Sequence, residues 1–134
     1  MRPLLVLILG FYSLTIQGAP ACEKCDLEQV KVTQENLYGL TFAMVQEFLC
    51  TFDESCDDLE FSKLSNETLF DVVYNNPELF LKVLQYGKLK NHDLIMKELG
   101  SPAHAGINVE VIRSKVKKMD EKYMFKYDVL SALD

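Results

Sequence analysis

The stretch NPELFLKVLQYG, residues 76–87, shows most clearly how this chain folds. Asn76 is a typical helix-capping residue, and Pro77 follows at the first helical position, where its missing N–H costs no hydrogen bond. Four apolar residues then recur at the spacing of one helix face: Leu79, Phe80, Val83 and Leu84. Gly87 supplies the stop. These signals predict an amphipathic helix from Pro77 to about Tyr86.

Similar signals recur on both sides of this segment. After it, Asn91 caps a predicted helix that ends at Gly100, and the Ser101–Gly106 segment is a predicted loop. Before it, a short helix is predicted over residues 57–64. A second one follows, with Ser65 or Asn66 as its cap and its end near Asn75.

The two ends of the remaining sequence give longer apolar stripes. Residues from about Asp26 or Thr33 to Cys50 form a helical region that Gly39 interrupts, and the longest helix is predicted from Asn108 to about Leu133. Strand signals are scarce. The fold class predicted from the sequence is therefore all-α, a small disulfide-stapled bundle of about five or six helices.

The first residues predict secretion. Arg2 precedes an apolar run from Leu4 to Ile16, which is too short and too polar for a membrane-spanning helix but suits a signal peptide. Small residues place the cleavage after Gly18 or after Ala21. We therefore predict a signal peptide over residues 1–18, a single helical domain over residues 19–134, and a secreted, extracellular protein without a transmembrane segment after cleavage.

The charge of the chain is acidic. The formal net charge is −6, and removal of Arg2 with the leader leaves 13 basic and 20 acidic side chains, a net charge of −7. A small protein with this charge repels a polyanion, so nucleic acid is excluded as a partner.

Four cysteines lie beyond the predicted leader, which in a small secreted chain indicates two disulfides: Cys22, Cys25, Cys50 and Cys56. If residues 26–50 form one straight helix, its ends lie about 37 Å apart, and only the local pairing of Cys22 with Cys25 and of Cys50 with Cys56 is feasible. If the chain reverses near Gly39, the nested pairing of Cys25 with Cys50 and of Cys22 with Cys56 becomes feasible. The nested pairing is the better structural staple, whereas the continuous apolar stripe favours the local one.

Two further features mark candidate surfaces. Asn66-Glu67-Thr68 is an N-glycosylation sequon, so the sequence predicts a glycan on Asn66 at the surface. In the predicted last helix, four lysines flank the apolar stripe and form a candidate face toward a membrane or a partner: Lys115, Lys118, Lys122 and Lys126. They equally suit the charged flank of a helix that faces the core.

No catalytic, cofactor-binding or metal-binding residues are predicted. His92 and His104 are assigned to the surface, since neither belongs to a motif that would bring a nucleophile to it. A dithiol catalyst at Cys22-Glu-Lys-Cys25 is disfavoured because no strand precedes the motif, and an oxidising compartment disfavours zinc. The sequence therefore indicates that the protein is not an enzyme.

The spacing of Cys22, Cys25 and Cys50 resembles the opening of saposin-like domains, which are secreted helical bundles that bind lipids or disturb membranes. The family's last two cysteines are absent here. We expect a secreted binding or effector protein whose partner, an extracellular protein or a lipid, is unknown. The alternative, which the resemblance implies, is a carrier of lipids or small apolar ligands that interacts with a membrane surface.

Overall fold

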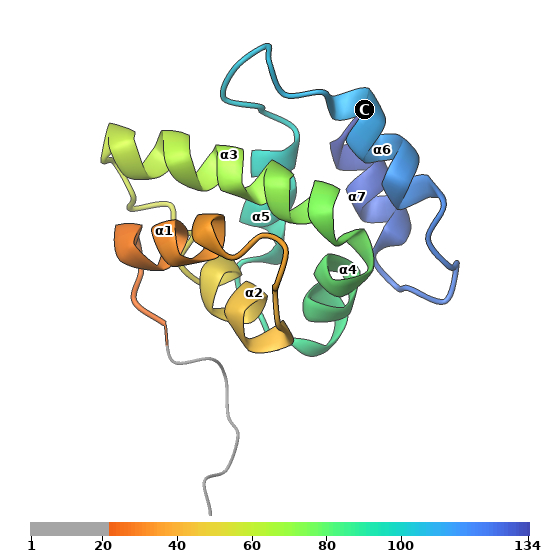
Figure 1. The fold of residues 1–134 in the computed structure, drawn as a ribbon, viewed down its shortest axis with the longest axis horizontal. Helices are drawn as coiled ribbons and strands as arrows, with labels where there is room; N and C mark the ends of the chain where they lie inside the picture. The colour runs from red at the N-terminus through yellow and green to blue at the C-terminus, as the bar shows by residue number, and fades with distance from the viewer. Residues whose placement is uncertain (1–21) are drawn as a thin grey trace, which may run out of the picture.

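A computed structural model describes residues 22–134, and the predicted signal peptide lies outside this range. The described residues form seven α-helices and no strand, so the all-α class is confirmed with more helices than predicted (Figure 1). In chain order the helices are α1 (Leu27–Glu35), α2 (Phe42–Leu49), α3 (Leu59–Asn75), α4 (Pro77–Tyr86), α5 (His92–Leu99), α6 (Val109–Lys117) and α7 (Lys126–Ala132). None of them has the length and apolar character needed to cross a membrane.

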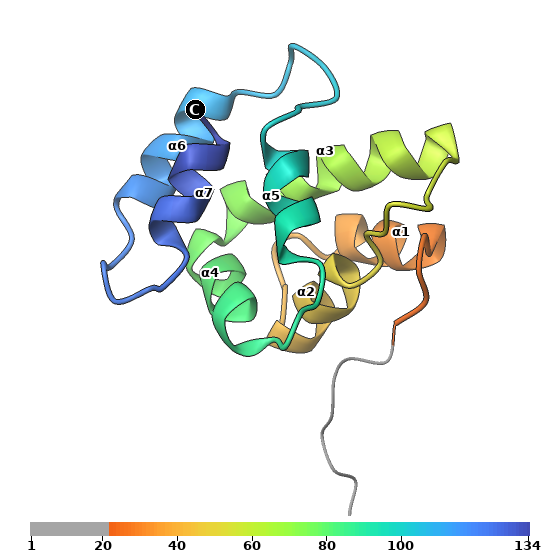
Figure 2. The same ribbon diagram turned by 180° about the vertical axis from the view of Figure 1, so that it is seen from behind.

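Helix α3 is the longest helix of the described chain, and the others are arranged around it. It contacts α1, α4, α5 and α6, whereas α7 packs on α5 and α6 (Figure 2). Its buried face supplies Phe61, Leu69, Phe70, Val72 and Val73 to the core. The side chains that meet them from other helices include Val30, Phe48, Phe80, Leu81, Ile95, Val116 and Val129. Burial of these apolar side chains is the main force that holds the helices together.

The helices with both a start and a stop signal form where the sequence predicts them. The Asn76 side chain accepts a hydrogen bond from the Leu79 N–H and caps α4, which starts at Pro77 and ends before Gly87. Helix α5 likewise lies between Asn91 and Gly100. Here the Asn91 amide does not cap its own helix but donates to the carbonyl oxygens of Leu49 and Phe52.

The region before Cys50 consists of two helices with a chain reversal between them. Helix α1 ends at Glu35, and Thr41 caps α2 by accepting a hydrogen bond from the Met44 N–H. The break falls around Asn36–Gly39, where a reversal was one of the two predicted alternatives. It brings the end of α2 back toward the start of α1, so the single straight helix is excluded.

The predicted boundary at Ser65 and Asn66 is wrong. Both residues lie inside α3. The N-cap of this helix is Asp58, whose side chain accepts a hydrogen bond from the Phe61 N–H. Their side chains are buried and bond elsewhere, because Ser65 Oγ donates to the Ser62 carbonyl and Asn66 bonds to a distant loop. Residues of a type that often caps helices can therefore lie inside a helix, where their side chains make other contacts.

The predicted long last helix is also wrong, and with it the lysine face. Helix α6 ends at Lys117 and α7 begins at Lys126, with a turn between them. Lys126 is buried and its Nζ donates to the Met119 carbonyl, while Lys115 Nζ donates to the Tyr74 carbonyl. Since Lys118 and Lys122 lie in the connecting segment, the four lysines do not form one helix face.

Tyr123 ties this connecting segment to α4. Its buried phenol donates to Glu78 Oε1 at 2.6 Å. This hydrogen bond, with burial as the second cause, raises the pKa of Tyr123 to about 12. The same hydrogen bond, followed by the one from Lys82, lowers the pKa of Glu78.

We expect this pair to make stability fall at alkaline pH. Because the folded chain holds the phenol proton more tightly than the unfolded chain does, the contribution is fully present below pH 10 and is lost as the pH rises toward about 12. Titration of tyrosine absorbance should show a component near pH 12 that disappears in Tyr123→Phe. An unchanged titration curve in that variant would contradict the assignment.

Candidate functional site

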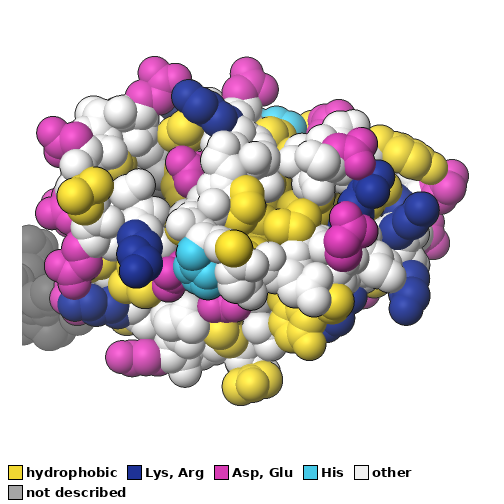
Figure 3. All heavy atoms as spheres, turned by 90° about the horizontal axis from the view of Figure 1, so that it is seen from above, with side chains coloured by type: hydrophobic (Ala, Val, Ile, Leu, Met, Phe, Trp, Pro, Cys, Tyr) yellow, Lys and Arg dark blue, Asp and Glu magenta, His cyan; other side chains and the backbone are white. Residues whose placement is uncertain are grey.

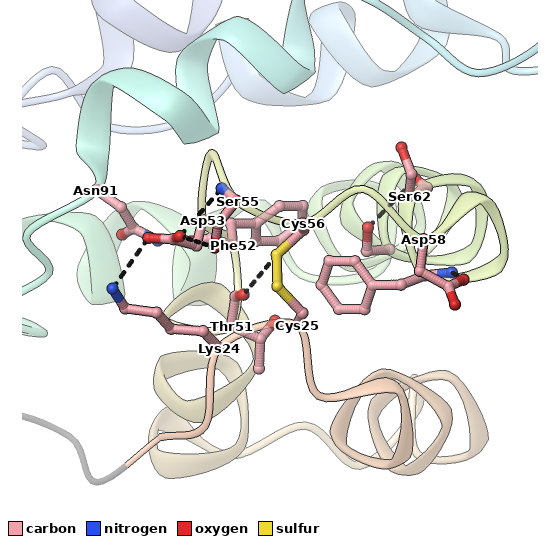
Figure 4. The surroundings of a disulfide bond; sticks show 12 residues. Lys24, Cys25, Thr51, Phe52, Asp53, Ser55, Cys56, Asp58, Ser62 and Asn91 are labelled. Atoms are coloured by element: carbon pink, nitrogen blue, oxygen red, sulfur yellow. Dashed lines mark hydrogen bonds and ion pairs between the residues drawn. A yellow bond between two sulfur atoms is a disulfide. The ribbon is translucent and has the colours of Figure 1, made fainter.

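All four predicted cysteines are paired, but in neither of the two arrangements derived from the sequence. The disulfides join Cys22 to Cys50 and Cys25 to Cys56, with Cα–Cα distances of 6.0 and 5.5 Å. Figure 4 shows the second of them. The nested and the local pairing are therefore both wrong. The reason is the position of Cys25, whose N–H donates to the Thr51 carbonyl at 2.8 Å. This contact places Cys25 beside the segment that leads to Cys56 and leaves Cys22 next to Cys50.

A small network of polar side chains lies beside the Cys25–Cys56 disulfide. Lys24 Nζ lies 3.3 Å from an oxygen of Asp53, which also accepts hydrogen bonds from Ser55 (Figure 4). The hydrogen bonds from Ser55, followed by that from Lys24, lower the pKa of Asp53. These contacts order the connection between α2 and α3, and Lys24 and Asp53 also line a hollow of about 310 Å³ beside Cys22 and Cys50.

The predicted glycosylation site at Asn66 conflicts with the folded structure. The side chain is only 4% exposed, and its Nδ2, the atom that would carry the glycan, donates to Glu98 Oε2 at 2.8 Å and to the Ser101 carbonyl at 3.1 Å. Its Oδ1 accepts from the Ala103 N–H at 2.8 Å. A glycan on Nδ2 would replace these contacts, so Asn66 connects α3 to the segment after α5 rather than facing solvent.

The segment that Asn66 holds forms one wall of a cleft. We define the α3–α6 cleft as the hollow between α3, residues 104–108 and the first turns of α6, with a volume of about 460 Å³. Figure 3 looks onto this end of the molecule, where hydrophobic, acidic and histidine side chains lie close together. The volume lies within the range of sites for small organic molecules.

One part of the cleft is apolar. Phe70 and Ile112 are almost completely buried and line its inner surface. Tyr74 and Val111 line it with 42% and 41% of their surface exposed, so they form an accessible hydrophobic rim. Ile107, from the loop before α6, also lines this part of the cleft. The apolar part therefore offers contact surface to a ring or an alkyl group.

The other part carries the titratable side chains Glu67, Asp71 and His104. The Gly106 N–H donates to His104 Nδ1 at 3.1 Å, and His104 Nε2 lies 3.3 Å from Glu67 Oε1. Because Nδ1 acts as the acceptor, Nε2 is the nitrogen that donates its proton to Glu67. His104 thus positions the Glu67 carboxyl group.

Asp71 lies one helical turn after Glu67 and is held by α1. Burial is the largest cause that raises the pKa of Asp71, while a hydrogen bond from the Gln34 side chain lowers it and the negative charge of Glu67 raises it further. Gln34 is itself fixed, since its Oε1 accepts from the buried Thr68 hydroxyl at 2.9 Å. The two carboxyl groups therefore lie in fixed positions in the wall of the cleft.

The sequence did not predict this site. Glu67, Phe70, Asp71 and Tyr74 share one helix face by their spacing alone, a signal that could have indicated a mixed acidic and aromatic surface. His104 is exposed, as the sequence predicted, but its place opposite Glu67 depends on how the segment after α5 folds back over α3.

Comparisons with models of known protein families, with curated proteins and with solved structures give no match to this chain. The functional conclusion accordingly rests on the described geometry.

Proposed function

We propose that this chain is a secreted, non-enzymatic binding protein and that it holds its ligand in the α3–α6 cleft. The observation that carries the proposal is the composition of the cleft: an apolar inner surface from Phe70 and Ile112 next to the fixed polar groups of Glu67, Asp71 and His104. Apolar contact area combined with a few oriented polar groups is the usual design of a small-molecule site.

The lining of the cleft supports binding rather than catalysis. None of the ten residues that line it is a serine, threonine, cysteine or lysine, so the cleft has no aliphatic hydroxyl, thiol or amine to act as a nucleophile. The imidazole of His104 is occupied on both nitrogens, by the Gly106 N–H and by Glu67. These groups orient one another instead of being held ready for a proton transfer.

The proposed compartment is supported by the two disulfides. Cross-links of this kind persist in oxidising surroundings, and the apolar run of residues 4–16 has the composition of a secretory signal. Purification of the protein from the medium of secreting cells, followed by thiol titration, tests this part. We expect a chain that begins at Ala19 or Cys22 and carries no free thiol.

Ligand binding is tested by nuclear magnetic resonance with a library of small aromatic and aliphatic compounds that includes cations, anions and neutral molecules. Some compounds should shift the backbone amide signals of Ile107, Val111 and Ile112. In Val111→Trp, the indole fills the rim of the cleft, and we expect the affinity for these compounds to fall at least ten-fold.

Val32→Trp is the matched control, because Val32 is 43% exposed, nearly as much as Val111, but lies on α1 away from the cleft. It should keep the affinity of the original protein. If no compound shifts the cleft signals, or if both tryptophan variants bind equally well, the cleft is not the binding site.

A further inference from the structure

We propose that the α3–α6 cleft selects a small organic cation, namely an ammonium group attached to a compact ring or branched alkyl body. This inference rests on the proposed function and specifies its ligand class. It follows from three features of the cleft: two carboxyl groups with no lysine or arginine among the lining residues, the orientation of His104 against Glu67, and the partial burial of Asp71 next to an aromatic and aliphatic surface.

The first feature is the negative charge of the two carboxyl groups. Glu67 and Asp71 both line the cleft and lie one turn apart on α3, so the two carboxylates repel each other. No lysine or arginine lines the cleft with them. Lys115, which belongs to α6, is directed to the Tyr74 carbonyl at 2.8 Å and does not reach the carboxyl groups through any described contact.

The second feature is the orientation of His104. The Gly106 N–H donates to Nδ1, which turns Nε2 toward Glu67 at 3.3 Å from Oε1. There is no room for a side chain on Gly106, since its Cβ would lie 2.9 Å from His104 Nδ1. The imidazole therefore holds the Glu67 carboxyl group in one position in the cleft.

The third feature is the partial burial of Asp71. Removal of this carboxyl group from water raises its pKa more than the hydrogen bond from Gln34 and the nearby His104 lower it. An ammonium group between Asp71 and Glu67 would add a cationic partner, and the attached ring would cover Phe70, Ile112 and the rim residue Tyr74. A cation of this shape satisfies the charge and the apolar surface together.

Three compounds with the same indole ring test the inference: tryptamine with an ammonium group, tryptophol with a hydroxyl group and indole-3-acetate with a carboxylate. We expect tryptamine to bind at least ten-fold more tightly than tryptophol in calorimetric or resonance titrations, and indole-3-acetate to bind most weakly. The preference for tryptamine should shrink as salt is added, because the ion pair is partly exposed.

Two isosteric variants assign the preference to the carboxyl groups. Glu67→Gln and Asp71→Asn should each reduce tryptamine affinity at least three-fold and leave tryptophol affinity unchanged. Glu60→Gln, which alters an exposed acid on α3 outside the cleft, should change neither. A short lysine peptide should bind more weakly than tryptamine because its ammonium group is carried on a flexible chain.

Several results would overturn this inference. They are equal binding of the three indoles, tighter binding of the acetate or of the lysine peptide, no binding of tryptamine, and a tryptamine preference that survives in both isosteric variants. Equal binding at the cleft would leave the proposed function intact, because the cleft would still hold a ligand. By contrast, the absence of any library compound from the cleft would refute the proposed function itself.

Discussion

Loss of both disulfides should lower the free energy of unfolding by about 6 kcal/mol, which is comparable to the whole stability of a small domain. The cross-links span 28 and 31 residues, and the first of them restricts the unfolded chain by about 3.7 kcal/mol through loop entropy. The second adds less, because the two loops overlap. With one bond closed, the other closes a ring made of the three steps from Cys22 to Cys25 and the six from Cys50 to Cys56.

A ring of about ten residues corresponds to about 2.7 kcal/mol. We therefore expect Cys22→Ser with Cys50→Ser to cost about as much as Cys25→Ser with Cys56→Ser, roughly 3 kcal/mol each by this entropy term. Removal of all four cysteines should cost more than the sum of the two pair removals. Urea denaturation of the three variants and the original protein measures these differences.

The pairing itself can be checked by mass spectrometry. Cleavage after Lys24 separates Cys22 from Cys25, and cleavage at Asp53 separates Cys50 from Cys56. The expected cross-linked peptides contain Cys22 with Cys50 and Cys25 with Cys56. Peptides that join Cys22 to Cys56 would contradict the structure, and a stability loss below about 1 kcal/mol for the four-fold variant would contradict the loop argument.

The sequence predicted those helices whose ends are marked by local chemistry. Asn76-Pro77 and Gly87 delimit α4, and Asn91 and Gly100 delimit α5, as the structure confirms. Caps and stops act within one turn of the chain, so they can be recognised without knowledge of the fold.

The sequence failed where a tertiary contact decides the local structure. The apolar stripe continues from Val109 to Leu130, yet the chain turns after Lys117 because Lys126 bonds back to Met119 and Tyr123 bonds to Glu78 on α4. Helical periodicity alone could not reveal this break. The disulfide pairing failed for the same reason, since it follows from the contact of Cys25 with Thr51.

The candidate site could be predicted only in part. The helix-face spacing of Glu67, Phe70, Asp71 and Tyr74 is present in the sequence, but the wall opposite them is a loop whose course depends on one buried side chain of α3. That side chain is Asn66, and the sequence pattern around it suggested a different role, as a glycan acceptor.

Substitution of Asn66 should therefore also lower the free energy of unfolding strongly. Asn66→Ala removes the acceptor of the Ala103 N–H and the donor to the Ser101 carbonyl and to Glu98, three hydrogen bonds of a buried side chain. Each such hydrogen bond contributes roughly 0.5–1.5 kcal/mol net, so we expect a loss of about 2–4 kcal/mol in the free energy of unfolding. Lys63→Ala, which alters an exposed lysine of α3 whose side chain makes no described hydrogen bond or ion pair, should change stability by less than about 0.5 kcal/mol.

Local measurements separate this role from a general loss of packing. In Asn66→Ala the Ala103 amide should exchange with solvent faster than amides at the centre of α3, because its acceptor is gone while the helix persists. The mass of the secreted protein should not change on treatment with an amidase that removes N-glycans, since Nδ2 is occupied inside the fold. A fully glycosylated protein with unchanged stability, or slow Ala103 exchange in the variant, would show that Asn66 does not hold the wall of the cleft.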